Sequence, residues 1–124
     1  MDNPLTKPEV LMQKLGLLVL AIGLTIFLLI FGIHQWRLSD PYIKSVLSLA
    51  GNPIQGHAIF QMNCSGCHGL MADGHVGPSL KNISERKSDF RLIYQVISGQ
   101  TPPMPQFQPS PQEMADLLSY LKSL

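Results

Sequence analysis

The chain has 124 residues, which leaves room for one small domain and little more. Nine Lys and Arg residues against eight Asp and Glu residues give a formal net charge of +1. Because positive and negative side chains are nearly equal in number, net charge gives no support for a nucleic-acid partner. The hydrophobic residues, 45% of the chain, are unevenly distributed along it.

The first predicted element is a transmembrane helix at residues 14–36, preceded by a short polar leader, residues 1–13, expected on the cytoplasmic side. Residues 15–33 read LGLLVLAIGLTIFLLIFGI, a stretch of nineteen residues without a charge. As a helix this stretch is about 28 Å long, close to the hydrocarbon thickness of a bilayer. Trp36 and Arg37 follow it and suit the headgroup region.

Two other interpretations explain this stretch less well. A buried core helix is rarely apolar on every face, and the rest of the chain is too small to surround one. A cleaved signal peptide usually has a shorter apolar run with an Ala-x-Ala-like site after it, and FGIHQWRLSD contains no such site. Lys7 and Lys14 before the span nearly balance Arg37 and Lys44 after it, so charge counting leaves the orientation open.

Residues 37–52 are predicted to form a linker, with one short helix at residues 42–49. Residues 53–124 are predicted to be the functional domain. Helical patterns recur in this domain, and no stretch alternates apolar and polar residues well enough to require a sheet. The predicted fold is therefore all-α, a small helical domain preceded by one transmembrane helix.

Three helices are expected within this domain. The first leads directly into the sequence NCSGCHG. The second has Ser88 or Asp89 as its N-cap and stops at Gly99. The third begins with a capping box formed by Ser110 and Glu113. Its apolar stripe consists of Met114, Leu117, Leu118 and Leu121.

NCSGCHG, residues 63–69, contains both cysteines of the chain, Cys64 and Cys67, followed at once by His68. Cys-x-x-Cys-His is the attachment motif of c-type haem. Thiols three positions apart at the end of a helix can bond two vinyl-derived carbons of one porphyrin, and the adjacent imidazole then projects toward the iron. The sequence predicts one haem c, bound covalently through Cys64 and Cys67, with His68 as an iron ligand.

Other uses of this motif fit the chain less well. A structural zinc or an iron–sulfur cluster usually needs four ligands, and no further cysteine is present. A thioredoxin-like redox pair would need a βαβ context. A chance occurrence of the motif would not explain why it contains both cysteines of the chain and directly follows an amphipathic helix.

Met104 is the predicted iron ligand opposite His68. It lies in PPMPQF, a loop stiffened by prolines, so the thioether would be presented by a restricted backbone. The other possible donors are Met62, Met71, Met114, His57 and His75. Met114 belongs to the helical stripe and fills the core. Met62 and Met71 lie too near the cysteines to reach the opposite face of the haem easily. We interpret both histidines as solvated surface residues.

With these motifs, residues 56–124 resemble the class I cytochrome c domain. GHAIFQMNCSGCHG looks like the first helix of that family, and LLSYLKS looks like its last. The resemblance implies that Gly56 lets these two helices cross at close range. It also implies that Leu117 and Tyr120 pack against the first helix.

Two loops extend the resemblance to the haem contacts. GPSL resembles the loop in which a proline carbonyl, here that of Pro78, accepts a hydrogen bond from the ligand imidazole. MPQF looks like the axial methionine loop. The resemblance therefore implies a haem c site that includes Phe60, Pro78 and Phe107 beside the covalent and axial residues.

The implied activity is transfer of single electrons by a protein that is not an enzyme. With both axial positions filled, substrate cannot readily reach the iron, and His/Met ligation raises the reduction potential. No small-molecule substrate is expected. The expected partners are membrane redox complexes or small electron carriers. The charged stretch at residues 81–91 either steers docking to an acidic partner or is simply a solvated face.

Among membrane-anchored members, the chain most resembles the cytochrome M type of cyanobacteria. This implies a single-pass protein of the thylakoid or plasma membrane, with its N-terminus cytoplasmic and its haem domain lumenal or periplasmic, working in respiration or photosynthesis. Two alternatives stay open. One is a fixed haem subunit of an oxidase-type complex, and the other is a haem enzyme or sensor with a displaceable sixth ligand.

Overall fold

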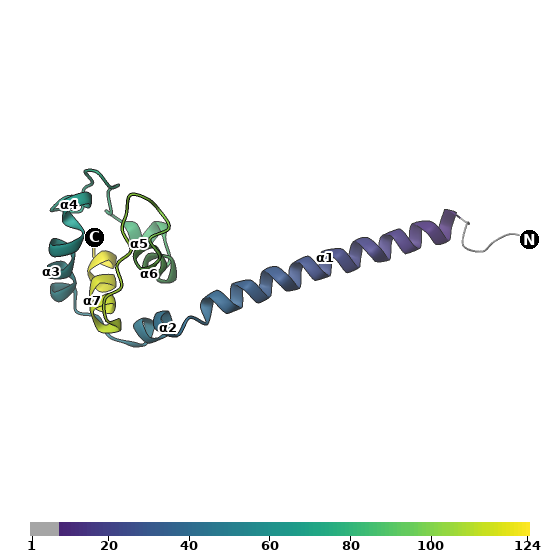
Figure 1. The fold of residues 1–124 in the computed structure, drawn as a ribbon, viewed down its shortest axis with the longest axis horizontal. Coiled ribbons are helices and arrows are strands. Elements are labelled where there is room, and N and C mark those ends of the chain that lie inside the picture. Colours follow the sequence, from purple (N-terminus) through teal and green to yellow (C-terminus); the bar gives the residue numbers. More distant parts are fainter. Residues whose placement is uncertain (1–7) are drawn as a thin grey trace, which may run out of the picture. The chain divides into compact units, whose positions relative to one another are not determined.

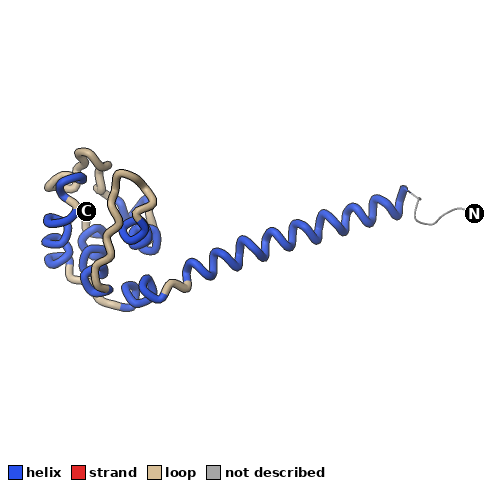
Figure 2. Tube along the Cα trace, in the orientation of Figure 1, coloured by secondary structure: helices blue, strands red, loops and turns tan. Residues whose placement is uncertain are grey.

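Helices and loops make up the part of the chain that the computed structural model describes, residues 8–124 (Figures 1 and 2). No strand occurs among these residues, which confirms the predicted all-α class. The chain divides into two units, Met1–Arg37 and Leu38–Leu124. The predicted leader begins in residues 1–7, which lie outside the described part.

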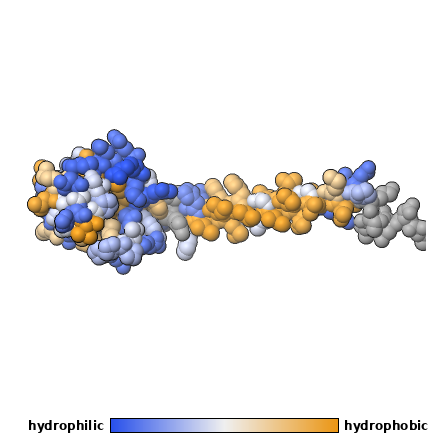
Figure 3. All heavy atoms as spheres, turned by 90° about the horizontal axis from the view of Figure 1, so that it is seen from above, coloured by the Kyte–Doolittle hydropathy of each residue, from blue (hydrophilic) through white to orange (hydrophobic). Residues whose placement is uncertain are grey.

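The first unit contains α1 (Pro8–Leu38) except for its last residue, and this continuous helix has no charged residue between Lys14 and Arg37. The face drawn in Figure 3 is hydrophobic along the middle of the helix. Pro8–Trp36 is long and apolar enough to cross a membrane, and none of its most apolar window is buried against protein. The helix begins earlier than the predicted residue 14, because Glu9, Leu11, Met12 and Gln13 are good helix formers and extend it beyond the apolar stretch.

The second unit begins with α2 (Pro41–Ser48), within the segment predicted as a linker. The Asp40 carboxylate caps this helix by accepting a hydrogen bond from the Tyr42 backbone N–H at 2.9 Å. Ile43 and Val46 point into the core and are almost fully buried. The Tyr42 hydroxyl donates to the Pro109 carbonyl at 2.9 Å. The short predicted helix is confirmed to within one residue, and it packs on α7 and α6.

The pair α3 (Pro53–Asn63) and α7 (Pro111–Lys122) forms the most extensive contact of this unit. Gly56 lies where they cross, and a Cβ at this position would collide with the Asp116 carbonyl. The Phe60 ring lies 5.3 Å from the ring of Tyr120, centroid to centroid. The close crossing implied by the resemblance is thus confirmed.

The N-terminus of α7 carries the predicted capping box. The Ser110 hydroxyl oxygen accepts from the Glu113 backbone N–H at 3.3 Å, and the Glu113 carboxylate accepts from the Ser110 backbone N–H at 2.8 Å. The apolar stripe predicted for this helix is buried throughout; it consists of Met114, Leu117, Leu118 and Leu121.

Three further helices complete the unit. The α6 helix (Asp89–Ser98) has Ser88 at its N-cap, and Gly99 follows it in the left-handed conformation, as the stop signal predicted. The one-turn helices α4 (Ser65–His68) and α5 (Ile83–Arg86) had no sequence prediction. Both are too short to show a helical period.

Candidate haem site

His68 is a buried residue at the end of α4, with 9% of its surface exposed. Its Nδ1 lies 2.8 Å from the carbonyl oxygen of Pro78. A carbonyl oxygen only accepts, so Nδ1 carries the proton and donates. In the neutral ring Nε2 then keeps its lone pair, which is the donor that a metal ion requires. This is the hydrogen bond that the resemblance implied for Pro78.

Gly77 packs against the same imidazole. A Cβ at Gly77 would lie 2.8 Å from Cε1 and 2.9 Å from Nδ1 of His68, so only glycine leaves room for the ring. The loop is held there by two backbone bonds. The Gly77 N–H donates to the Cys67 carbonyl at 2.7 Å, and the Gly74 N–H donates to the His68 carbonyl at 2.8 Å. The ring orientation is therefore fixed on both sides.

The two cysteines flank the start of α4, since Cys64 is its N-cap and Cys67 is its third residue. Cys64 is half-buried where α3 ends, and its carbonyl accepts from the His68 backbone N–H at 2.9 Å. Cys67 is exposed, and no disulfide joins the two. Burial, with a smaller contribution from Cys67, raises the pKa of the Cys64 thiol to about 11. Because no disulfide joins them, both sulfurs are free for covalent attachment.

Met104 is half-buried in the loop between α6 and α7. Its backbone N–H donates to the Thr101 carbonyl at 2.9 Å. The Gln95 side-chain amide donates to the Thr101 hydroxyl at 2.8 Å and approaches the Met104 sulfur at 3.9 Å. Phe107 is tied to α6, because its N–H donates to the Val96 carbonyl at 3.0 Å. The thioether is thus positioned by a side chain of α6.

These contacts assemble the predicted residues into two groups. One holds both cysteines, His68 and Pro78 around α4, and the other holds Met104 and Phe107 beside α6. Phe60 lies at the crossing of α3 and α7 and touches Tyr120.

The remaining possible donors also have defined places. Met114 belongs to the core, as predicted. His57, His75, Met62 and Met71 are exposed. Gly77 and Gln95 are the site residues that the sequence analysis missed. For Gly77 the GPSL motif held a signal, but nothing local identifies Gln95.

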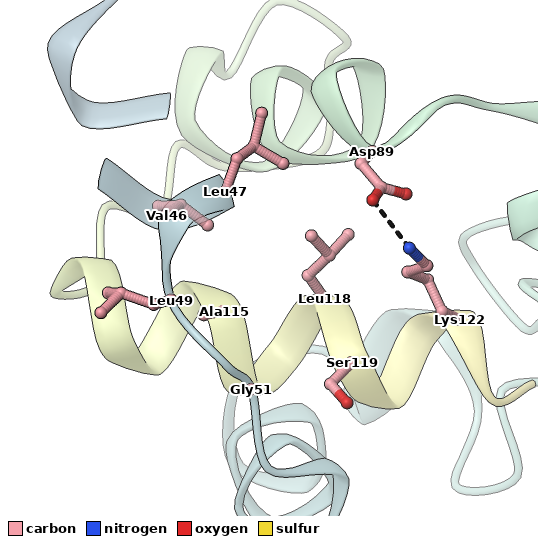
Figure 4. Close-up of a pocket in the computed structure, with 9 residues that line it drawn as sticks. All are labelled: Val46, Leu47, Leu49, Gly51, Asp89, Ala115, Leu118, Ser119 and Lys122. Atoms are coloured by element: carbon pink, nitrogen blue, oxygen red, sulfur yellow. Dashed lines mark hydrogen bonds and ion pairs between the residues drawn. The ribbon is translucent and has the colours of Figure 1, made fainter. Parts of the chain in front are cut away.

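A cavity of about 310 Å³ lies elsewhere in this unit, between α2, α6 and α7 (Figure 4). The ion pair between Asp89 and Lys122, 2.7 Å from oxygen to nitrogen, closes one edge of it. None of the predicted haem residues lines this cavity. Its lining consists of Val46, Leu47, Leu49, Gly51, Asp89, Ala115, Leu118, Ser119 and Lys122.

Comparison with known proteins places this site in a family. The family described as cytochrome C oxidase, cbb3-type, subunit III matches residues 51–121. The cytochrome c-553-like protein of Synechocystis sp. is 62% identical over 85 residues, which cover 68% of this chain and 81% of that protein. Cytochrome c-550 of Bacillus subtilis is 34% identical over 83 residues, covering 65% of this chain and 68% of that protein.

Among solved structures, cytochrome cL from Hyphomicrobium denitrificans matches 66% of this chain with a TM-score of 0.49 and 26% identity. The match spans half the length of that protein. The family match covers the second unit from the start of α3 almost to its end, including the Cys-x-x-Cys-His motif. The resemblance to class I cytochromes c is therefore confirmed, and this chain belongs to the cytochrome c family.

Proposed function

We propose that this chain is a membrane-anchored electron carrier with one haem c, attached covalently through Cys64 and Cys67. His68 and Met104 are the proposed axial ligands. The carrier passes single electrons between membrane redox complexes or small electron carriers, acts on no small-molecule substrate and is not an enzyme. When bound, the haem supplies one-electron redox chemistry at its iron.

The orientation of His68 is the observation that carries this proposal. Its Nδ1 donates to Pro78 and Gly77 leaves space for the ring, so Nε2 is the nitrogen that carries the lone pair in the neutral ring. The bond to a carbonyl also raises the basicity of the imidazole. A surface histidine that merely follows two cysteines by chance would need neither neighbour.

The other residues have distinct roles in this proposal. The free thiols of Cys64 and Cys67 flank the histidine and supply the covalent attachment. The Met104 thioether, which the Gln95 amide approaches at 3.9 Å, would hold the haem iron together with His68. Aromatic side chains from α3 and from the methionine loop, Phe60 and Phe107, supply apolar surface to the macrocycle.

The proposed topology rests on α1. Residues 14–36 span the membrane, residues 1–13 stay in the cytoplasm, and residues 53–124 form the haem domain on the lumenal or periplasmic side. Attachment of c-type haem on the outer side, which the resemblance implies, sets this orientation. The membrane is a thylakoid or plasma membrane, in line with the Synechocystis relative. An anchor restricts the search for a partner to one surface.

Expression in cells that mature c-type cytochromes tests the proposal. The full chain is expected to keep its haem through denaturation, and the variant with Cys64→Ser and Cys67→Ser is expected to lose it. A matched control changes two exposed residues near the motif, Met62→Ser and Met71→Ser. A colourless wild-type product with two titratable thiols would contradict the proposal.

A fixed subunit of an oxidase-type complex is a second candidate, because the matching family is described as an oxidase subunit. Extraction of native membranes in mild detergent, followed by sizing, separates the two. A carrier migrates as a small particle on its own. A subunit migrates with oxidase activity and stays with it through a second column.

A further inference from the structure

Gln61, near the end of α3, joins a histidine to the loop that follows the proposed haem attachment. Its side-chain amide nitrogen lies 2.8 Å from the carbonyl oxygen of Leu70 and 3.2 Å from Nε2 of His57. Leu70 belongs to residues 69–72, which lead away from His68 at the end of α4. In the part of the chain that the structure describes, no other hydrogen bond joins α3 to this loop.

Residues 69–72 hold an uncommon backbone conformation. Ala72 has a φ of 55°, in the left-handed region that alanine rarely adopts, and it is fully buried. Its N–H donates to the Gly69 carbonyl at 3.0 Å, and its carbonyl accepts from the Leu80 N–H at 2.9 Å. A residue keeps such a conformation only where its surroundings hold it. The bond from Gln61 to Leu70 is therefore one of the contacts that keep this loop in place.

The two contacts of Gln61 determine the protonation of His57. A carbonyl oxygen only accepts, so Gln61 must present its NH2 group to Leu70. The same NH2 group faces His57, and because it only donates, Nε2 of His57 must be the acceptor. The imidazole is therefore neutral in this structure, with its proton on Nδ1.

A second proton on His57 is incompatible with this arrangement. Nε2 then carries a hydrogen and meets the NH2 group of Gln61, so two donors face each other. If the carboxamide turns its oxygen to His57, that oxygen also faces the Leu70 carbonyl, and two acceptors meet. Gln61 can thus bond to the charged histidine or to the loop, but not to both. A hydrogen bond from a charged donor is stronger than one between neutral groups, so Gln61 turns to the histidine.

Tyr120 of α7 is a titratable group in contact with His57. The two rings lie 5.0 Å apart, centroid to centroid. Burial raises the pKa of Tyr120, so its hydroxyl stays neutral where histidines titrate. A charged imidazole is attracted to the face of an aromatic ring, so His57 keeps its place when it is protonated.

The other titratable groups on the elements packed against α3 have partners or roles of their own. On α7 the Glu113 carboxylate bonds to Ser110, the Asp116 carboxylate bonds to Asn52, and Lys122 pairs with Asp89. In and beside α4, the titratable side chains are Cys64, Cys67 and His68 of the proposed haem attachment and Asp73, which lies against Gly69. Within α3, His57 is the one titratable residue.

We propose that His57 and Gln61 form a proton-sensitive tie: neutral His57 leaves Gln61 bound to the loop at residues 69–72, and protonated His57 releases this loop. Histidine is the side chain that ordinarily changes charge between pH 5 and 8. Leu70 is exposed, so water takes the place of the lost donor. The loop begins next to His68, so as a control of the haem site this inference rests on the proposed function.

Amide hydrogen exchange of the full-length, haem-loaded protein in detergent tests the tie. Protection factors, which remove the intrinsic pH dependence of exchange, are compared at about pH 8 and about pH 5. The Ala72 amide is expected to lose protection roughly tenfold at the lower pH, since one hydrogen bond fewer holds the loop. The Gly77 amide is the internal control, because its bond to the Cys67 carbonyl does not involve Gln61.

Matched substitutions separate His57 from acidification in general. His57→Gln keeps a neutral acceptor for Gln61 and takes no proton, so protection at Ala72 should be the same at both pH values. His75→Gln is the control, because it removes another exposed histidine that lies outside the tie, and it should keep the wild-type loss. Gln61→Ala should lower protection at Ala72 at both pH values, since the bond to Leu70 is absent throughout.

Haem content and the absorption spectrum are measured first in every variant. Equal wild-type protection at both pH values, or a loss that His57→Gln retains, overturns the tie and leaves the proposed function standing. A loss that His75→Gln abolishes, or that extends to the Gly77 amide, also overturns it, because acid then loosens the domain by another route. A wild-type product without haem overturns the proposed function, and with it the inferred control of the haem site.

Discussion

Asp116 of α7 fixes the start of α3, because its carboxylate accepts a hydrogen bond from the Asn52 backbone N–H at 2.8 Å. Gln112, one turn earlier, donates to the same carboxylate oxygen and to the Ala50 carbonyl, each at 3.0 Å. Asp116 is buried although its neighbours in α7 are apolar. The carboxylate therefore ties residues 50–52 to the helix pair that supports the haem site.

Asp116→Ala should lower the free energy of unfolding by about 1–3 kcal/mol, since the Asn52 N–H would lose its acceptor in a part-buried setting. Asp116→Asn keeps one oxygen acceptor and should lose less. Urea unfolding of the haem-loaded chain in detergent measures both. Asp73→Ala, at an exposed position, is the control. Equal midpoints for Asp116→Ala and this control would show that the bond contributes nothing.

Gly77→Ala should disturb the proposed iron ligand. The added methyl would come within 2.8 Å of the His68 ring, so the ring or the loop must move and the bond to Pro78 weakens. A less basic imidazole stabilises ferric iron less, so we expect a higher reduction potential and a lower yield of haem-bound protein.

Gly66→Ala is the matched control for Gly77→Ala. Gly66 also lies in α4, inside the cysteine motif, but a Cβ there meets no atom within 4 Å. Potentiometric titration and haem content per protein measure the effect. If both variants keep the wild-type potential and yield, Gly77 does not position the ring.

Much of the helical framework was readable from the sequence, because its signals are local. The capping box of Ser110 and Glu113 fixes where α7 begins, and Gly99 marks where α6 ends. The Cys-x-x-Cys-His motif is also local, so the residues around His68 could be named in advance. The crossing at Gly56 followed from the family resemblance.

Features that depend on distant residues could not be read in the same way. The α2 helix has only eight residues, and the burial of Ile43 and Val46 depends on α7, more than sixty positions later. A short helix in a presumed linker gives no sign of such packing. Gln95 likewise meets Met104 only because the loop folds back on α6. No period or motif encodes that contact.

Ile43→Ala tests whether α2 is part of the folded domain. Ile43 is fully buried, so its truncation should lower the free energy of unfolding by about 2–5 kcal/mol. Leu47→Ala, in the same helix but half exposed, should have a much smaller effect. Denaturant titration of the haem-loaded chain compares them. Equal, small losses would mean that residues 41–48 act as a simple linker.

The capping box should make stability depend on pH. Hydrogen bonds from the Ser110 side chain, and then from its backbone N–H, lower the pKa of the Glu113 carboxyl below its ordinary value. The unfolded state therefore binds more protons between the two pKa values. The stabilisation is present above the unfolded pKa and is lost as pH falls through the folded pKa.

Glu113→Gln removes this titration, so the stability difference between wild type and variant should shrink as the solution becomes more acid. The comparison cancels other acid transitions that the two chains share. Denaturant unfolding at a series of pH values from neutral to about 3 measures it. A difference that is constant or grows toward low pH would contradict the assignment.

Met104→Ala should open one axial position of the proposed haem. The absorption band of methionine bound to ferric iron should disappear, and the ferrous protein should bind carbon monoxide, because among residues 8–124 Gln95 holds no thioether other than that of Met104. Met71→Ala, at an exposed loop position, should keep the band and exclude carbon monoxide. If wild type already binds carbon monoxide, the site is open or its sixth ligand is displaceable, which favours a sensor or enzyme. If Met104→Ala keeps the band, another methionine is the ligand, and the loop that contains Met104 has a different role.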